Sequence, residues 1–340
     1  MKKPAALPLP ALFALLALLC SAFWPHISLP SRRAGAPDGA AQAAALLSAD
    51  ARRALSASAT PIVPAPHSGY KDQLNPRLSE QYLVWNESTG ADGSDAIFGL
   101  DLRTNSPVTV TTAPGRQVLD GISGSLVVWT APGHTCANCE RDIQAKDLAT
   151  GALYNVATGP ADQVEAAVSG RTVSWIEVDK GRSRLLFSNL DTGGVTEVAT
   201  LSGNATFERP VIDDDYLVWA ENRPEGNYGG YNSTLRALDR KSGQTKDVGT
   251  ILSSGYPEYA LADHRLLWTN PGLNLTDLQS GETRTIANRR VSGPSILGSY
   301  VAWSEGRNSF EIWGLQLPDG GPIPLLLDPG GLTGLVMAGD

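Results

Sequence analysis

Short stretches of alternating hydrophobic and polar residues recur along most of the chain, and six of them end in tryptophan. Each Trp follows a hydrophobic residue by two positions, a turn-forming residue by five and another hydrophobic residue by seven. The residues are Trp85, Trp129, Trp175, Trp219, Trp268 and Trp303. This spacing predicts a short strand, a tight turn and an alternating strand that ends in Trp, repeated six times.

A second phrase follows each Trp and predicts another turn. Residues 147–151 read Asp-Leu-Ala-Thr-Gly, and residues 189–193 read Asn-Leu-Asp-Thr-Gly. In such turns the Asp, Asn and Thr oxygens accept hydrogen bonds from nearby amides, and the closing Gly takes a positive φ. Together with a fourth strand, each repeat of about 44 residues predicts one blade. We therefore expect an all-β fold, a six-bladed β-propeller with four antiparallel strands per blade.

The start of the chain has the pattern of an export segment. Lys2 and Lys3 precede a long apolar run, which is typical of a signal peptide or a signal anchor. The run is close to the minimum length that spans a bilayer, so cleavage and anchoring both stay open. Lipidation at Cys20 is disfavoured by Leu19, where a small residue is normally found. We expect an extracytoplasmic protein, whether periplasmic, secreted or membrane-anchored at the cell surface, that meets a membrane only through this segment.

The composition changes along the chain and suggests four parts. An Ala- and Pro-rich stretch separates the export segment from the first repeat. The expected parts are a signal peptide or membrane anchor (1–25), an Ala/Pro-rich linker (26–68), the propeller (69–330) and a C-terminal tail (331–340).

The net charge and the absence of several catalytic motifs narrow the classes of function that fit the chain. Lys and Arg number 27 against 35 Asp and Glu, a net charge of −8, so we expect no nucleic-acid partner. The sequence has no Gly-x-Ser-x-Gly elbow, no His-Glu-x-x-His pair and no phosphate-binding Gly loop. The chain has only four histidines that could act as a general acid or base, which disfavours a His-dependent hydrolase. We expect no cofactor, no metal and no catalytic residue of these kinds.

Acidic residues near the strands leave one kind of chemistry open. Glu165, Glu208 and Glu258 fall near the starts of the innermost strands, where a propeller can place carboxylates around its channel. The favoured interpretation is nevertheless that they are solvated strand ends. Residues 213–215, three consecutive aspartates, fall in a turn between first and second strands, and we expect them to be solvated there.

The two repeated phrases resemble those of TolB-like propellers over roughly residues 75–328. The resemblance implies a six-bladed propeller and an extracytoplasmic interaction domain, since TolB itself works in a cell-envelope protein assembly. Both phrases are structural, so the resemblance is informative about fold and much less so about activity.

The loops after each Trp differ most in length, and repeat scaffolds place binding insertions in such loops. The long loops of the first, second and fourth repeats, 86–96, 131–143 and 221–233, are expected to share one face of the propeller, which we take as the working face. The alternative is neutral drift in exposed loops.

Five residues of these loops are candidate ligand-binding residues: Asp92, Asp95, His134, Tyr228 and Tyr231. The two tyrosines stand among Gly and Asn, a composition typical of adaptable recognition loops, although one of them could pack back on the blade. The two aspartates bring oxygens close together in sequence, but the twelve-residue calcium-loop pattern is absent.

The second long loop contains Cys136 and Cys139. In an exported chain a local disulfide is the expected state of such a pair. A metal site would need further ligands, and only His134 is near in sequence.

These observations predict a non-catalytic propeller that binds an envelope or extracellular protein, with carbohydrate as another possible ligand, through its long-loop face. The alternative is a carbohydrate-active lyase or glycosidase that uses carboxylates at the channel mouth. Two or more carboxylates that converge in the channel with raised pKa values would favour this alternative.

Overall fold

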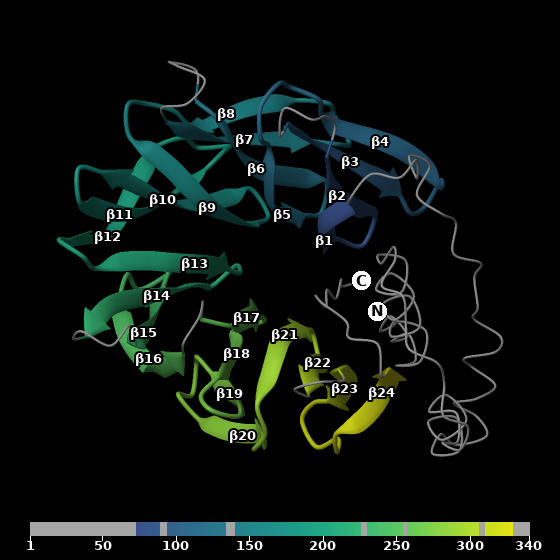
Figure 1. Ribbon diagram of the computed structural model, residues 1–340, viewed down its shortest axis with the longest axis vertical. Coiled ribbons are helices and arrows are strands. Elements are labelled where there is room, and N and C mark those ends of the chain that lie inside the picture. The colour runs from purple at the N-terminus through teal and green to yellow at the C-terminus, as the bar shows by residue number, and fades with distance from the viewer. Residues whose placement is uncertain are drawn as a thin grey trace, which may run out of the picture.

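The computed structural model describes residues 73–88, 94–133, 140–225, 230–253, 257–305 and 310–328. These residues form six four-stranded antiparallel sheets, each made of four consecutive strands. Figure 1 shows the sheets as blades around a common centre, which is lined by the first strand of each blade, β1, β5, β9, β13, β17 and β21. The expected six-bladed propeller with four antiparallel strands per blade is confirmed.

The strands of the first three blades are β1 (Gln73–Leu78), β2 (Tyr82–Ser88), β3 (Asp95–Asp101), β4 (Ser106–Thr111), β5 (Val118–Ser123), β6 (Leu126–Pro132), β7 (Arg141–Asp147), β8 (Leu153–Ala157), β9 (Asp162–Ser169), β10 (Thr172–Asp179), β11 (Arg182–Asn189) and β12 (Val195–Ser202). Those of the last three blades are β13 (Thr206–Ile212), β14 (Tyr216–Glu225), β15 (Gly230–Asp239), β16 (Thr245–Ser253), β17 (Tyr259–Ala262), β18 (Arg265–Thr269), β19 (Leu273–Asp277), β20 (Thr283–Ala287), β21 (Val291–Leu297), β22 (Tyr300–Glu305), β23 (Phe310–Gln316) and β24 (Ile323–Asp328).

The export segment, the linker and the C-terminal tail lie outside the described residues. Within the described part of the chain, no helix is both long and apolar enough to cross a membrane.

The repeated tryptophans explain how the blades hold together. Five hydrophobic clusters each join one blade to the next, and each contains the Trp of the later blade. Trp129 of blade 2, for example, is fully buried against Val84 and Ile97 of blade 1. Because an indole buries a large apolar area, one Trp per blade supplies much of each interface.

Close backbone approach at one of these interfaces depends on a glycine. A Cβ atom on Gly249, in blade 4, would lie 2.6 Å from Cη2 of Trp268 in blade 5. Only glycine leaves room there for the indole to reach the sheet of the preceding blade.

The turns after the third strands form as the second phrase predicts. Oδ1 of Asp147 accepts hydrogen bonds from the Ser125 hydroxyl and the Ala149 amide, and Gly151 closes the turn at a φ of 77°. In blade 4 the amides of Ser242 and Lys241 hold the pKa of Asp239 below its usual range. The phrase is therefore a backbone-capping device and lies at the end of each blade opposite the long loops.

Candidate functional site

Two of the seven sequence-predicted site residues lie within the described part of the chain. Asp92, His134, Cys136, Cys139 and Tyr228 lie outside the described residues. Asp95 and the backbone of Tyr231 are described. The candidate site is therefore built from the bases of the long loops and from the channel that they surround.

Asp95 anchors the base of the first long loop. It begins β3, and its Oδ2 lies 3.6 Å from Nε of Arg116 in the connection between blades 1 and 2. The backbone of Asp95 also bonds to Gly115 and Gln117, at 3.3 Å each. In the described residues, then, Asp95 ties its loop to the next blade.

A bidentate ion pair anchors the second long loop. Arg141 begins β7, and its guanidinium binds Asp162 at the start of β9 in blade 3, with Nε donating to Oδ1 at 2.8 Å. The backbone N–H of Arg141 donates to the same carboxylate at 2.9 Å. This contact raises the pKa of Arg141 and fixes the end of the loop against the neighbouring blade.

The third long loop is mostly a hairpin. The sequence predicts a loop over 221–233, whereas β14 runs on to Glu225 and β15 begins at Gly230, with Tyr231 opposite Pro224. β16 extends alongside and pairs Ser253 with Tyr231. At about 3.3 Å per residue, the six residues of β14 beyond Trp219 carry the sheet about 20 Å further. In blade 5, β18 ends one residue after its Trp.

A buried charge holds the base of this hairpin. The Glu221 side chain is 7% exposed, and its carboxylate forms an ion pair with Nε of Arg236 at 2.9 Å. It also accepts hydrogen bonds from Arg223 at 3.3 Å and from the Trp219 indole at 3.4 Å. Arg236 also lies 3.2 Å from Asp247 on β16. One carboxylate thus joins the two long strands, and Arg236 extends the connection to the third.

The centre of the propeller carries a second group of polar residues. Five inner strands, β1, β5, β9, β13 and β21, have a β-bulge close to the channel mouth. Asn75, Glu165, Arg209 and Gly293, each ten residues before its Trp, have φ between 49° and 57° there. A bulge leaves backbone groups without a ladder partner and redirects side chains, and here both effects connect neighbouring blades.

Asp120 is the most perturbed acid in this group. Its Oδ2 accepts from the Thr130 hydroxyl at 2.7 Å, its carboxylate from the Ala166 amide of blade 3, and its backbone oxygen from Nε of Arg77 at 3.0 Å. Burial raises the pKa of Asp120 to about 7, and the charge of Glu165 adds to the shift. Folding therefore favours the protonated form of this carboxyl.

Glu165 and Glu258 accept backbone hydrogen bonds from the next blade. Oε2 of Glu165 takes the Arg209 amide at 2.6 Å, and Oε2 of Glu258 takes the Gly293 amide at 2.9 Å. Burial raises the pKa of Glu165. Glu208 instead accepts from the side-chain amide of Asn222 at 2.9 Å. These acids are partly buried and hydrogen-bonded, so the expectation of solvated strand ends is wrong for them.

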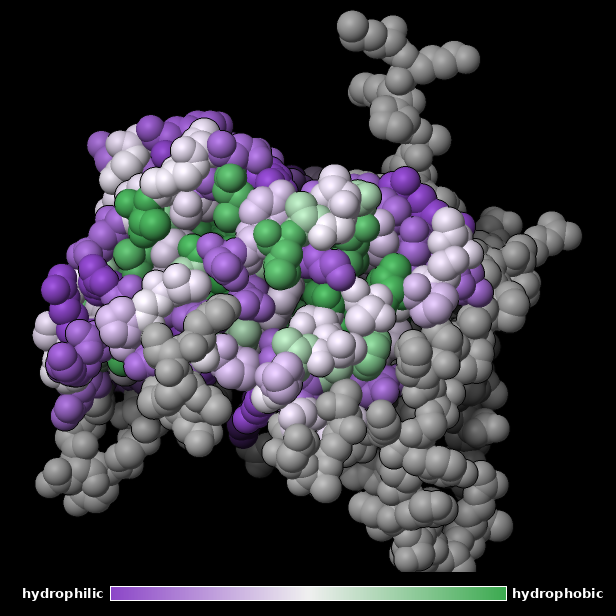
Figure 2. All heavy atoms as spheres, turned by 90° about the horizontal axis from the view of Figure 1, so that it is seen from above, coloured by the Kyte–Doolittle hydropathy of each residue, from purple (hydrophilic) through white to green (hydrophobic). Residues whose placement is uncertain are grey.

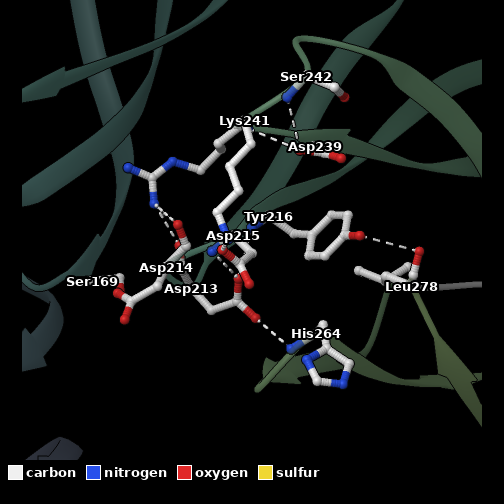
Figure 3. Close-up of polar contacts among 11 residues, drawn as sticks. Ser169, Asp213, Asp214, Asp215, Tyr216, Asp239, Lys241, Ser242, His264 and Leu278 are labelled. Atoms are coloured by element: carbon white, nitrogen blue, oxygen red, sulfur yellow. Dashed lines mark hydrogen bonds and ion pairs between the residues drawn. The ribbon is translucent and has the colours of Figure 1, made fainter.

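Two of the three aspartates of blade 4, Asp213 and Asp214, connect blades at the opposite end of the ring. Figure 3 shows Asp213 pointing toward His264 of blade 5 and Asp214 toward Ser169 of blade 3. The distances are 2.8 Å from the His264 amide to Oδ2 of Asp213, and 3.0 Å from the Ser169 hydroxyl to Oδ1 of Asp214. Asp215 lies 2.6 Å from the Lys241 amino group. The expectation of a solvated turn holds for Asp214, which is exposed, and is wrong for Asp213 and Asp215, which are partly buried.

Similar hydrogen bonds cross each of the five consecutive blade interfaces at these turns. They run from Ser79 Oγ to Gly124 O (2.8 Å), Gly170 N to Ser123 Oγ (2.9 Å), Ser169 Oγ to Asp214 Oδ1 (3.0 Å), His264 N to Asp213 Oδ2 (2.8 Å) and Arg265 Nη1 to Gly298 O (2.9 Å). We call this series the turn belt. It accounts for Asp213 and Asp214 without a ligand.

Within the described part of the chain, the outer rim over blades 1 and 2 carries no continuous hydrophobic patch (Figure 2). Figure 2 looks onto the rim that is uppermost in Figure 1, over β4 and β8, and shows small hydrophobic groups separated by hydrophilic ones. Among the described residues, no group of three or more His, Cys, Asp or Glu side chains is placed to hold a metal. The long-loop bases and the channel mouth therefore remain the candidate site.

No protein-family model matches the sequence, and no curated protein matches it. Three solved structures to which the chain is similar belong to a protease, a peptidase and TolB. The β-propeller domain of the trilobed protease from Pyrococcus furiosus is 12% identical, with a TM-score of 0.56 over 75% of this chain and 85% of that one.

A prolyl endopeptidase is 13% identical, with a TM-score of 0.55 over 78% of this chain and 44% of that one. TolB from Acinetobacter baumannii is 12% identical, with a TM-score of 0.48 over 76% of this chain and 67% of that one. At such identities the comparisons concern the fold alone. The chain thus has the six-bladed β-propeller fold that its repeats predict.

Proposed function

We propose that this protein is an extracytoplasmic binding propeller that engages an envelope or extracellular protein through its long-loop face. The observation that carries the proposal is the three-stranded extension of blade 4. β14, β15 and β16 continue together beyond the ring, and their register is kept as far as the pair Glu225 and Gly230.

The anchored loop bases support the same proposal. Asp95, Arg141 and Glu221 each fix the base of one long loop through an ion pair. Loops held in place before binding lose less conformational entropy when a partner arrives, which raises affinity without adding contacts. Asp92, His134, Tyr228 and Tyr231 remain the proposed ligand-contacting residues, and Cys136 and Cys139 the proposed disulfide of the second loop.

The register of the hairpin gives a clean test. Asn222 and Ser233 are paired across β14 and β15, so the ten residues between them can be replaced by an Asn-Gly turn without disturbing the sheet below. The purified full-length chain and this trimmed variant are used as baits in the envelope extract of the source cells. Each partner identified is then titrated by calorimetry.

We expect a partner that binds the intact chain and loses at least tenfold in affinity for the trimmed variant. The matched control is Arg103→Ala, an exposed change in the blade 1 turn at the opposite end, which should bind as the intact chain does. Equal binding by the intact and trimmed chains would remove the hairpin from the binding site.

A second candidate function is carboxylate chemistry in the channel. It is favoured by the two neighbouring acids Asp120 and Glu165, whose pKa values are both raised by burial. An acid with a pKa near 7 can exchange a proton at neutral pH, as a lyase or glycosidase requires. Turnover of an oligosaccharide panel that Asp120→Asn abolishes, and that the trimmed variant retains, would establish this function instead.

A further inference from the structure

A groove of about 520 Å³ lies between blades 2 and 3. The last strand of blade 2, β8, forms one wall with Val156 and Ala157, and the sheet of blade 3 forms the other with Leu186 and Trp175. Its volume is in the range of small-molecule sites, and its walls combine apolar and polar side chains as such sites do.

Two buried polar atoms of blade 3 residues that line this groove have no hydrogen-bond partner. They are Oε1 of Gln163 and Nε1 of Trp175, whose residues are 1% and 2% exposed. An acceptor and a donor left unpaired away from water are both unfavourable, and native proteins rarely leave such groups unsatisfied. The two atoms are complementary, yet they do not bond to each other.

Four of the other repeats give this indole an acceptor, whereas the Trp85 indole of blade 1 is unpartnered like that of Trp175. In blade 2 the Trp129 indole donates to Oε1 of Gln117 at 3.1 Å, and Gln117 and Gln163 both stand twelve residues before their Trp. Blade 3 therefore has the same two residues as blade 2, with the hydrogen bond between them open.

Other blades use a Glu two residues after the Trp. In blade 6 the Trp303 indole donates to Glu305 at 2.9 Å. In blade 3 the equivalent Glu177 instead forms an ion pair with Arg184, which also lies 3.4 Å from Glu197. Both partners that the repeat offers to a Trp are thus present in blade 3, and neither accepts a hydrogen bond from the Trp175 indole.

We propose that this groove binds a neutral polyhydroxylated ligand, a mono- or disaccharide, one hydroxyl of which accepts from the Trp175 indole and donates to Oε1 of Gln163. A hydroxyl is a group that donates and accepts at once, as this pair requires. The apolar wall, with Val156 and Leu186, suits the C–H face of a sugar ring.

The charges of the groove select against anions. Its lining carries Glu177 and Glu197 against one cation, Arg184, which both acids already engage. Arg182, outside the lining, also lies 3.8 Å from Glu197, so a uronate or phosphate would meet two acids and no arginine that is not already in an ion pair. The inference is independent of protein binding through the long loops, because it uses none of their residues.

The test is saturation-transfer difference NMR and calorimetry on the full-length chain, with methyl glucoside, N-acetylglucosamine, maltose and cellobiose as probes and glucuronate as the anionic comparison. We expect saturable binding of at least one neutral sugar and at least tenfold weaker binding of glucuronate. Trp175→Phe and Gln163→Leu should each weaken sugar binding at least tenfold.

Blade 2 supplies the matched controls. Trp129→Phe and Gln117→Leu make the same chemical changes outside the groove and should leave sugar affinity unchanged. If Trp175→Phe fails to fold, Ala157→Trp, which fills the groove from β8, replaces it. Absence of saturable binding by every neutral probe, with the two atoms bridged by an ordered water only, would overturn the proposal, as would equal affinities of the blade 2 and blade 3 variants.

Discussion

The backbone amide of His264, in the blade 5 turn, donates a 2.8 Å hydrogen bond to the carboxylate of Asp213 in the blade 4 turn. The other oxygen of Asp213 accepts from the amides of Asp215 and Tyr216, at 3.0 Å and 2.7 Å. One side chain therefore closes its own turn and joins two blades.

Removing this carboxylate should destabilise the ring. We expect Asp213→Ala to lower the free energy of unfolding by about 1–3 kcal/mol, because three amides lose their acceptor. Urea unfolding followed by circular dichroism measures the change. Asp214→Asn, which keeps an acceptor for Ser169, should stay within about 0.5 kcal/mol of the unmodified chain. Equal midpoints for the two variants would contradict a role of Asp213 in joining the blades.

The raised pKa of Asp120 predicts a pH dependence with a definite sign. Since its pKa is about 7 in the folded state and 3.8 in the reference state, folding favours the protonated form. The free energy of unfolding should therefore fall as the pH rises from 4 to 7, by at most about 4 kcal/mol, and level off above that.

Asp120→Asn should flatten this profile, and urea titrations at pH values from 4.5 to 8 test it. Some slope should remain, because burial also raises the pKa of Glu165. The exposed Glu80→Gln variant should keep the full slope. A profile of Asp120→Asn as steep as that of the unmodified chain would place the coupled proton elsewhere.

The close approach of Trp268 to Gly249 predicts that one added methyl group at position 249 lowers the stability of the fold. Gly249→Ala places a Cβ 2.6 Å from the indole, so the sheet or the Trp must shift. We expect about 1–3 kcal/mol of destabilisation, measured as the unfolding midpoint in urea. Gly321→Ala is the control, since its Cβ would meet nothing within 4 Å. A neutral effect at Gly249 would mean that the blade 4–5 interface adjusts freely.

The burial of Glu221 predicts that replacing Arg236 lowers the free energy of unfolding more than replacing Arg223 does. Arg236→Met leaves a charge that is 7% exposed without its nearest partner, and should cost about 3 kcal/mol. Arg223→Met should cost less than about 1 kcal/mol, because that arginine is 61% exposed. In a double-mutant cycle, Glu221→Gln combined with Arg236→Met should recover part of the loss. Strict additivity would show that the two side chains do not interact.

The blades could be predicted from sequence because their determinants repeat. Trp129 and its equivalents occupy the same place in each interface, so a hydrophobic pattern at fixed spacing carries the fold. The blade 4 hairpin was predicted as a loop because Pro224 and Gly230 interrupt the alternation, although both lie within strands of the ladder.

The hydrogen bonds between blades at the inner bulges were not predicted from the sequence, for a physical reason. Glu165 and Arg209 have a positive φ at the inner bulges. Non-glycine residues seldom adopt this conformation, so a Glu or Arg in the sequence does not predict it. Their hydrogen bonds depend on which backbone groups the bulge leaves free, and that depends on the three-dimensional register.

Two further patterns in the sequence indicate polar contacts that were not predicted. Ser79, Ser123, Ser169 and Asp213 all stand six residues before their Trp and all take part in the turn belt. A Glu stands two residues after the Trp in four repeats, and in blades 4 and 6 it accepts from the indole. A comparison of polar as well as apolar positions across the repeats would have found both.

Every sheet of this propeller is one uninterrupted piece of chain, since each blade uses four consecutive strands. A cut in the connection between blades 2 and 3, between Thr158 and Asp162, would sever no hydrogen-bonded strand from its sheet. The two fragments would carry complementary faces, with Trp175 on one and its apolar socket of Val128 and Ile143 on the other. The path of the chain therefore allows the propeller to be divided into two fragments of whole blades. Each fragment keeps the interface surface through which it would reassemble with the other.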